Sequence, residues 1–239
     1  MTLCPTQTPD ISVIIPAYNE ARRLPLFLQR VIAHLAQRGQ PYEILVVDDG
    51  SQDQTAQAVT LAAHTCPSVR LIQLTCNMGK GAAVRRGMQA ARGSVQLFAD
   101  ADGAAPIEEV GRLEAALTAG ADLAIGSRAL ASKNPAFTVQ ARWHRSALGS
   151  LFNNLVRHLS AQPIADTQCG FKLFRQAVAQ DLFSVSCVDG YAFDLELLHI
   201  AANRQYICHP WHCQQTFAQD VIGGVLERDR RVLAILPVG

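Results

Sequence analysis

Two acidic segments of the chain have the composition to bind a cation or a phosphorylated ligand. Asp48 and Asp49 follow one apolar run, and Asp100 and Asp102 follow another. In an open α/β sheet, ligands bind outside the carboxyl ends of the strands, so we expect these carboxylates at that edge. Carboxylate oxygens suit hard divalent cations such as Mg²⁺ or Mn²⁺. The pair Asp100 and Asp102 therefore predicts a metal site that would neutralise the diphosphate of a nucleotide ligand.

Three further segments carry side chains suited to a nucleotide or its phosphates. Residues 77–81 read Asn-Met-Gly-Lys-Gly at the start of a predicted helix, where N–H groups favour a phosphate. The P-loop spacing is absent, and a plain glycine-rich turn is the alternative. Asn19 and Glu20 follow the first predicted strand and would either cap the next helix or contact a nucleotide. Arg128 follows a later strand and is either an anion contact or an ordinary surface arginine.

The candidate side chains must be positioned by regular secondary structure, and the first half of the chain predicts alternating strands and helices. Short β-branched runs predict strands, and apolar residues at i, i+3, i+4 and i+7 predict helices. The strands are expected at 11–15, 44–47, 69–74, 94–99 and 122–126, and the helices at 20–37, 55–63, 81–91 and 107–119. After a loop at 129–141, further helices are expected at 142–160 and 193–202. The alternation implies an α/β fold with a single, mainly parallel sheet flanked by helices.

Composition restricts the partners and surroundings of the protein. The 239 residues are 49% hydrophobic, which is enough for one large domain. A net charge of +1 gives no basic field for nucleic acid, which we do not expect as a partner. The seven scattered cysteines predict reduced thiols in a cytoplasmic setting. No apolar run approaches the ~20 residues that span a bilayer, and the N-terminus lacks a secretory pattern, so we expect a soluble or peripheral membrane protein.

Seven sequence blocks, in order along the chain, resemble the family 2 glycosyltransferases of the GT-A fold. The blocks are ISVIIPAYNE, EILVVDDGSQDQT, NMGKGAAVRRG, FADADGA, AIGSRA, DTQCGFKLF and YAFDLELLHIA, and they cover residues 11 to about 202. They are most similar to the branch that glucosylates dolichyl or other polyprenyl phosphates, and to its mannosyltransferase relatives. The last two blocks favour the glucosyl branch.

The resemblance implies roles for the matching residues. The nucleoside would be held by Pro16, Tyr18, Glu20 and Asp48, the diphosphate and its metal would face Asp100 and Asp102, and Lys80 and Arg128 would lie near the phosphates. Asp166 would sit near the transferred sugar, and Gln168 and Lys172 would line the acceptor side. Asp102 and Asp166 are thus the implied catalytic residues. Glu196, at the start of a predicted helix, is a further candidate for the active site.

The implied reaction is the transfer of glucose from UDP-glucose to a polyprenyl phosphate, with inversion at the anomeric carbon and Mg²⁺ or Mn²⁺ as cofactor. The lipid acceptor implies peripheral contact with the cytosolic face of a membrane. Transfer of another sugar, such as mannose from GDP-mannose, is the first alternative. A nucleotide-binding pseudoenzyme with a degenerate C-terminus is the second. A dinucleotide-binding domain is disfavoured because no G-x-G-x-x-G motif follows the first strand.

Three segments are expected along the chain: a flexible N-terminus at 1–10, the GT-A domain at 11–205 and a divergent tail at 206–239. The tail departs from the family pattern, and only Trp211 suggests it. Cys208, His209, His212 and Cys213 could form a zinc cluster, but their tight spacing is not that of a usual zinc finger. The departure puts acceptor binding and membrane docking in question more than donor binding.

Overall fold

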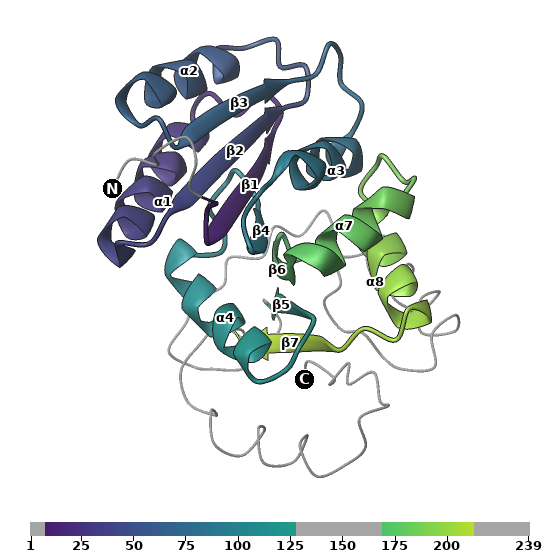
Figure 1. Cartoon of the computed structure of the whole chain (residues 1–239). Coiled ribbons are helices and arrows are strands. Elements are labelled where there is room, and N and C mark those ends of the chain that lie inside the picture. Colours follow the sequence, from purple (N-terminus) through teal and green to yellow (C-terminus); the bar gives the residue numbers. More distant parts are fainter. Residues whose placement is uncertain (1–7, 128–168, 213–239) are drawn as a thin grey trace, which may run out of the picture.

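The computed structural model describes residues 8–127 and 169–212, and these form one seven-stranded sheet with helices on both faces (Figure 1). The strands are β1 (Ile11–Ala17), β2 (Tyr42–Asp48), β3 (Val69–Gln73), β4 (Val95–Ala99), β5 (Leu123–Ser127), β6 (Phe171–Arg175) and β7 (Cys208–His212). Their order across the sheet is β3-β2-β1-β4-β6-β5-β7. All neighbouring pairs are parallel except those of β6, which runs antiparallel to β4 and to β5. The predicted α/β class with a mainly parallel sheet is confirmed.

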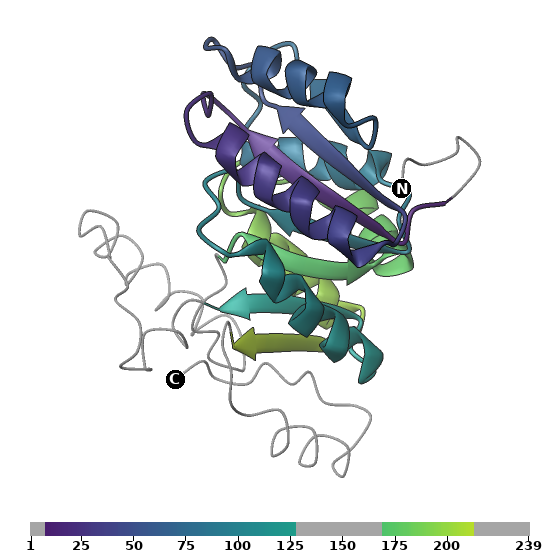
Figure 2. The ribbon, with the colours of Figure 1, turned by 90° about the vertical axis from the view of Figure 1, so that its left-hand side faces the viewer.

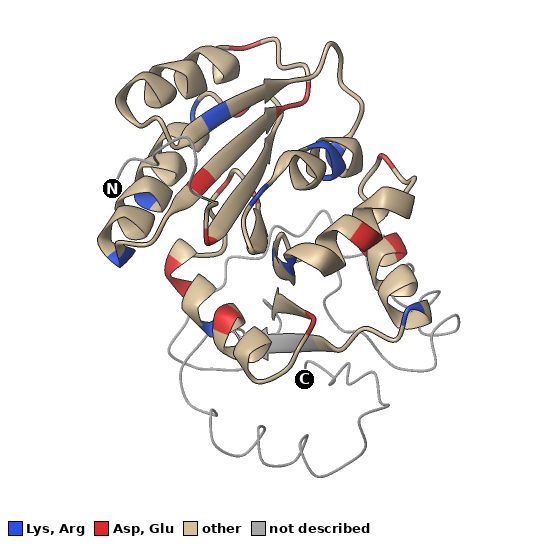
Figure 3. Ribbon diagram, viewed as in Figure 1, with Lys and Arg blue, Asp and Glu red and all other residues tan. Residues whose placement is uncertain are grey.

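The helices cover the two faces of the sheet in two groups (Figure 2). One group contains α1 (Leu24–Arg38), α2 (Thr55–Thr65) and α4 (Val110–Thr118), the last preceded by the 3₁₀ turn η1 (Ile107–Glu109). The other group contains α3 (Lys80–Ala90), α7 (Gln176–Val185) and α8 (Phe193–Asn203). With both faces covered, every residue of β1 and β2 is buried, which explains their mainly apolar sequences. Lys and Arg residues are interspersed with Asp and Glu over the described elements, not gathered by sign (Figure 3).

The chain reverses its direction of travel across the sheet between β1 and β4. The connections from β1 through β3 add strands on one side of β1, whereas α3 returns the chain to add β4 on the other side. Such a switch point opens a crevice at the carboxyl ends of the two strands and is the usual ligand site of open α/β sheets. Pro16 and Tyr18 lie at the end of β1, and Asp100 and Asp102 follow β4.

Helix α1 begins at Leu24, not at residue 20 as predicted, and ends before Gly39 as predicted. Residues 18–23 form turns instead, and Asn19 takes a left-handed conformation with φ of 55°. Pro25 lies in the first turn of the helix, where its missing N–H costs no hydrogen bond. The turns that precede α1 therefore place residues 18–23 at the carboxyl end of β1, which is the ligand edge of the sheet.

Strands β6 and β7 and helix α7 were not predicted from the sequence. The β6 strand has only five residues and carries Lys172 among apolar neighbours, so its local pattern is weak. Strand β7 pairs in parallel with β5 and lies beyond residue 205, where we expected the GT-A domain to end. The sheet therefore includes residues 208–212. Within the described residues, no helix is both long enough and apolar enough to cross a membrane.

The described cysteines differ in burial and therefore in expected reactivity. Cys76 and Cys187 are exposed, whereas Cys169 and Cys208 are buried. Burial raises the pKa of the Cys208 thiol to about 12, so this thiol stays protonated at neutral pH. Because the thiolate is the reactive form, we expect iodoacetamide at pH 8 to label Cys76 and Cys187 in the native protein well before Cys208. Peptide mapping by mass spectrometry checks this order, with urea-denatured protein as the control. Equal labelling of Cys208 without denaturant would contradict the position of β7 in the sheet.

Candidate active site

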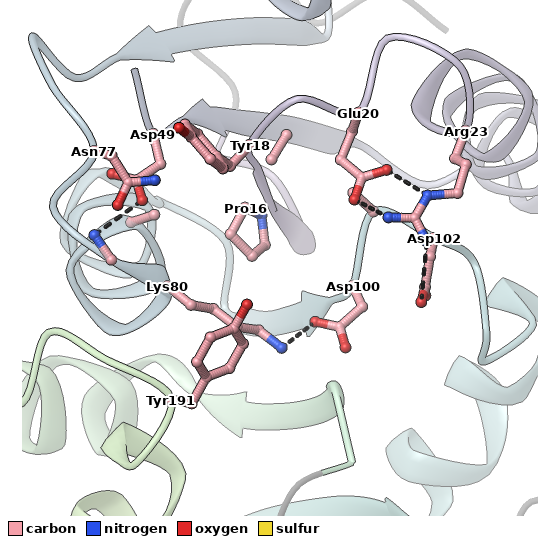
Figure 4. A pocket seen from close by; sticks show the side chains of 14 residues that line it. Pro16, Tyr18, Glu20, Arg23, Asp49, Asn77, Lys80, Asp100, Asp102 and Tyr191 are labelled. Atoms are coloured by element: carbon pink, nitrogen blue, oxygen red, sulfur yellow. Dashed lines mark hydrogen bonds and ion pairs between the residues drawn. The ribbon is translucent and has the colours of Figure 1, made fainter. Parts of the chain in front are cut away.

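A pocket of about 620 Å³ opens at the switch point between β1 and β4 (Figure 4). Its walls come from the ends of these strands, from the start of α3 and from the segment before α8. The residues that line it are Pro16, Ala17, Tyr18, Glu20, Arg23, Asp49, Asn77, Gly79, Lys80, Ala83, Asp100, Ala101, Asp102 and Tyr191. The structure thus gathers six of the predicted site residues: Pro16, Tyr18, Glu20, Lys80, Asp100 and Asp102.

The wall that follows β1 is held by hydrogen bonds to the loop that follows β2. The Asn19 N–H donates to Ser51 Oγ at 2.9 Å, and Asn19 Oδ1 accepts from the Gln52 N–H at 2.9 Å. The Glu20 N–H donates to Thr55 Oγ1 at 2.8 Å. These bonds fix the backbone that follows Tyr18, a residue that remains 43% exposed. The arrangement leaves the Tyr18 ring accessible for contact with a ligand.

Arg23 joins the two acidic walls of the pocket, although the sequence analysis gave it no role. Its Nε donates to Glu20 Oε2 at 2.6 Å, and its Nη1 lies 4.0 Å from Asp102 Oδ2. The hydrogen bond to Glu20 raises the pKa of the Arg23 guanidinium, which is charged in any case. The i, i+3 spacing of Glu20 and Arg23 was the available signal, but only the fold shows that Asp102 lies within reach.

Lys80 and Asp100 form an ion pair at the floor of the pocket, with Nζ and Oδ1 2.7 Å apart. Both side chains are about one-fifth exposed, at 21% and 19%. The Lys80 Nζ also lies 5.3 Å from the centroid of the Phe98 ring and 5.9 Å from that of Tyr191. The ion pair places one cationic and one anionic group where a diphosphate would be held.

Gly170 lies directly against the carboxylate of Asp100. The Asp100 N–H donates to the Gly170 carbonyl at 2.9 Å, and a Cβ at position 170 would overlap the Asp100 side chain. Since β6 brings Gly170 to this position beside β4, the glycine is needed for a close approach of the two strands.

We therefore expect Gly170→Ala to rotate the Asp100 carboxylate out of place and to lower turnover about 100-fold, as misplaced catalytic groups do. Turnover assays measure the effect, and thermal unfolding reports on the fold. Gly111→Ala is the matched control, because a Cβ there meets no atom within 4 Å. Unchanged turnover in Gly170→Ala would show that the orientation of Asp100 does not matter.

Most backbone N–H groups of the segment 77–81 donate hydrogen bonds to other parts of the chain. Asp49 accepts from the N–H groups of Met78 and Gly79 at 2.8 and 2.9 Å. The N–H groups of Gly81 and Ala82 donate to the Asp189 carbonyl at 2.7 and 3.3 Å. The first turn of α3 therefore offers few free N–H groups, and the predicted phosphate contact of this segment falls to the Lys80 side chain.

Three predicted site residues do not line the pocket. Asp48 is 1% exposed and accepts from the Ser51 N–H at 3.1 Å, so it shapes the loop after β2. Lys172 is also 1% exposed and forms a buried ion pair with Asp194, while its Nζ donates to the Cys169 carbonyl at 2.9 Å. Glu196 accepts from the N–H groups of residues 187 and 188 at 2.8 and 2.9 Å. In the structure, these side chains are therefore bonded within the protein, and their predicted roles at the ligand stay predictions.

Asp166, Gln168 and Arg128 lie outside the described residues, as do the predicted loop at 129–141 and the predicted helix at 142–160. Their predicted roles at the sugar, the acceptor and the phosphates therefore stay predictions.

The carboxylates of Asp100 and Asp102 fit a divalent cation by chemistry and accessibility. Both line the pocket, and the Asp102 side chain is 39% exposed. Among the described residues, no cluster of three or more His, Cys, Asp or Glu side chains is arranged to hold a metal ion. Mg²⁺ is commonly held by one or two carboxylates together with substrate phosphates, so two aspartates suffice if the ligand supplies the rest.

The sheet order, the switch-point pocket and the acidic pair after β4 define a GT-A type of nucleotide-binding fold. Solved structures agree. Glucosyl-3-phosphoglycerate synthase from Mycobacterium tuberculosis, in complex with phosphoglyceric acid, matches with a TM-score of 0.63 over 86% of this chain and 70% of that one, at 21% identity. The same enzyme in complex with Mn²⁺, UDP-glucose and phosphoglyceric acid matches with a TM-score of 0.59 over the same shares, at 19% identity. At such low identity these likenesses establish the fold.

The chain belongs to glycosyl transferase family 2, whose family model matches residues 12–183. It is 45% identical over 208 residues to a dolichyl-phosphate β-glucosyltransferase of Drosophila melanogaster, and 40% identical over 210 residues to one of Homo sapiens. Each alignment covers 81% of this chain and 63% of the relative. A dolichyl-phosphate β-glucosyltransferase of Saccharomyces cerevisiae is 37% identical over 212 residues. The chain thus spans less than two thirds of the length of these relatives. The family predicted from the sequence blocks is confirmed.

Proposed function

We propose that the protein transfers glucose from UDP-glucose to a polyprenyl phosphate, with inversion at the anomeric carbon. The observation that carries this proposal is the pocket at the switch point, which Lys80, Asp100 and Asp102 line together and which would receive the nucleotide diphosphate. The relatives, which are dolichyl-phosphate β-glucosyltransferases, support a glucosyl donor and a dolichyl-phosphate acceptor. The structural neighbour crystallised with UDP-glucose and Mn²⁺ supports the nucleotide and a divalent cation.

In this reaction a phosphate oxygen of the lipid attacks the anomeric carbon while the bond from that carbon to UDP breaks. Negative charge develops on the departing diphosphate, and the Lys80 ammonium group lies at the floor of the pocket to stabilise it. Arg23 adds a second positive charge beside Asp102. Held by Asp100 and Asp102, Mg²⁺ or Mn²⁺ would supply further positive charge against the same diphosphate.

The acceptor needs little help from a general base. The second pKa of a phosphate monoester is near ~6, so the attacking group is largely ionised at neutral pH. We therefore assign Asp166 to positioning the sugar or the acceptor and not to proton abstraction. The acceptor side as a whole, including Gln168, is a proposal that rests on the resemblance.

The acceptor also determines where the protein would act. A polyprenyl chain resides in a bilayer, so the phosphate must be met at the membrane surface. We propose peripheral binding to the cytosolic face, with a GT-A domain from residue 11 to about 205 extended by β7 and followed by the divergent tail. Co-sedimentation with liposomes that contain polyprenyl phosphate tests this location.

A panel of donors and acceptors tests the proposed reaction. UDP-glucose, GDP-mannose and other nucleotide sugars are each offered with polyprenyl phosphate, and the lipid product is identified by its mass. A glucosylated lipid from UDP-glucose supports the proposal, and a mannosylated lipid from GDP-mannose supports the alternative donor. Binding of a nucleotide without transfer or hydrolysis would instead indicate a pseudoenzyme.

A further inference from the structure

We propose that Tyr191 contacts the hexose of the nucleotide-sugar donor and helps to select it. This inference rests on the proposed function. It assigns a described residue to the sugar half of the donor, for which the sequence predicted Asp166, a residue outside the described part of the chain. Tyr191 precedes α8 and lines the pocket together with Lys80 and Asp100, which lie about 100 residues earlier in the chain (Figure 4).

The segment that carries Tyr191 is held against α3 by several independent contacts. The Glu196 carboxylate accepts from the N–H groups of Cys187 and Val188 at 2.8 and 2.9 Å. The Asp189 carbonyl accepts from the Gly81 N–H at 2.7 Å. Arg85 pairs with the Asp189 carboxylate as well. With its preceding backbone fixed in this way, Tyr191 is presented at a defined place on the pocket wall.

Close packing shows how near this segment lies to the start of α3. A Cβ at Gly81 would overlap the Val188 carbonyl and would lie 2.7 Å from the Cβ of Phe193. Only a glycine allows the helix and the segment to approach so closely. Lys80 directly precedes Gly81 and therefore lies near Tyr191.

Neither burial nor support of Lys80 accounts for the position of the Tyr191 ring. The side chain is 69% exposed, so packing contributes little there. The Lys80 Nζ lies 5.9 Å from the centroid of the Tyr191 ring, but it is 5.3 Å from that of Phe98 and 2.7 Å from Asp100 Oδ1. Lys80 is thus placed by Asp100 and Phe98, and the exposed ring of Tyr191 is left for a ligand.

The layout of the pocket indicates which part of the donor meets this ring. Pro16 and Tyr18 form the wall after β1, Tyr191 forms the wall before α8, and Lys80 and Asp100 lie between them (Figure 4). If the diphosphate binds at the centre, the two organic halves of the donor extend to opposite walls. With the nucleoside at the β1 wall, the hexose falls to Tyr191. A phenol suits a pyranose, since its face packs on C–H groups and its hydroxyl can hydrogen-bond.

Calorimetric titration with UDP and with UDP-glucose, in the presence of Mn²⁺, tests this assignment. We expect Tyr191→Ala to weaken UDP-glucose binding about tenfold while UDP affinity changes less than about twofold, because only the sugar contact is lost. Tyr191→Phe retains the ring and should keep most of the affinity for UDP-glucose. Leu61→Ala, at a side chain that is 68% exposed on α2, is the matched control.

Equal weakening of UDP and UDP-glucose in Tyr191→Ala would place the ring on the nucleoside and overturn the inference. Unchanged affinity for both ligands would remove Tyr191 from the donor site altogether. A wild-type protein that binds neither ligand would overturn the proposed function along with the inference. Wild-type binding with a failed Tyr191 effect would leave the proposed function standing.

Discussion

Asp102→Asn is expected to reduce sugar transfer at least ~100-fold while leaving the fold intact. The substitution removes one of the two carboxylate charges available to a cation, and a metal that stabilises a departing diphosphate contributes several kcal/mol to the transition state. Every 1.36 kcal/mol of lost stabilisation is a tenfold loss of rate. The side chain is 39% exposed, and the amide oxygen of asparagine can still accept the 3.0 Å bond from the Ala104 N–H. Initial rates of lipid glucosylation, compared with thermal unfolding, separate the two effects.

Two controls sharpen this experiment. Glu108→Gln makes the same change of acid to amide at an exposed position in the segment after Asp102, and it should retain full activity. Treatment of the wild-type protein with EDTA should reproduce the Asp102→Asn loss, and added Mg²⁺ or Mn²⁺ should restore only the wild type. Full activity of Asp102→Asn, or of the EDTA-treated protein, would remove the metal from the proposed reaction.

Asp194→Leu is expected to destabilise the protein by about 3–5 kcal/mol, because it leaves the Lys172 ammonium group buried without its counter-ion. Lys172 and Asp194 are 1% and 3% exposed, and the pair joins β6 to α8. Burial raises the pKa of the Asp194 carboxyl, and the nearby Lys172 ammonium group opposes this shift. Chemical denaturation measures the free energy of unfolding.

The double variant Lys172→Met/Asp194→Leu distinguishes the loss of a partner from the loss of packing. Replacing both charges with apolar groups should recover most of the stability, since the desolvation cost of the pair disappears with it. Arg112→Met removes one partner of the more accessible Arg112–Glu109 pair, at 28% and 15% exposure, and should cost less than about 1 kcal/mol. If Asp194→Leu cost no more than Arg112→Met, the interior pair would not behave as a buried one.

The sequence alone determined the parallel half of the fold and the acidic pair of the pocket. Strands β1, β2 and β4 are recognisable because both faces of the sheet are covered, so each run is mainly apolar. The carboxylates of Asp100 and Asp102 could be placed at the ligand edge because they directly follow such a strand. These properties depend on neighbours within a few residues and on the geometry that all parallel sheets share.

Other features could be decided only by the tertiary structure. Strand β6 was missed because Lys172 interrupts its short apolar pattern, and the partner that makes this lysine tolerable, Asp194, lies 22 residues later. Arg23 and Tyr191 line the pocket but were not predicted to, for a related reason. The sequence around Arg23 and Tyr191 does not show which distant residues they face, and in the structure Arg23 lies near Asp102 and Tyr191 near Lys80. Asp48 was predicted to contact the nucleoside from the resemblance, and Glu196 was a candidate from its position at the start of a helix. In the structure, backbone N–H groups donate to both carboxylates. Whether a charged side chain serves a ligand or its own loop depends on which donors the fold brings within about 3 Å, and that is a property of distant segments brought together.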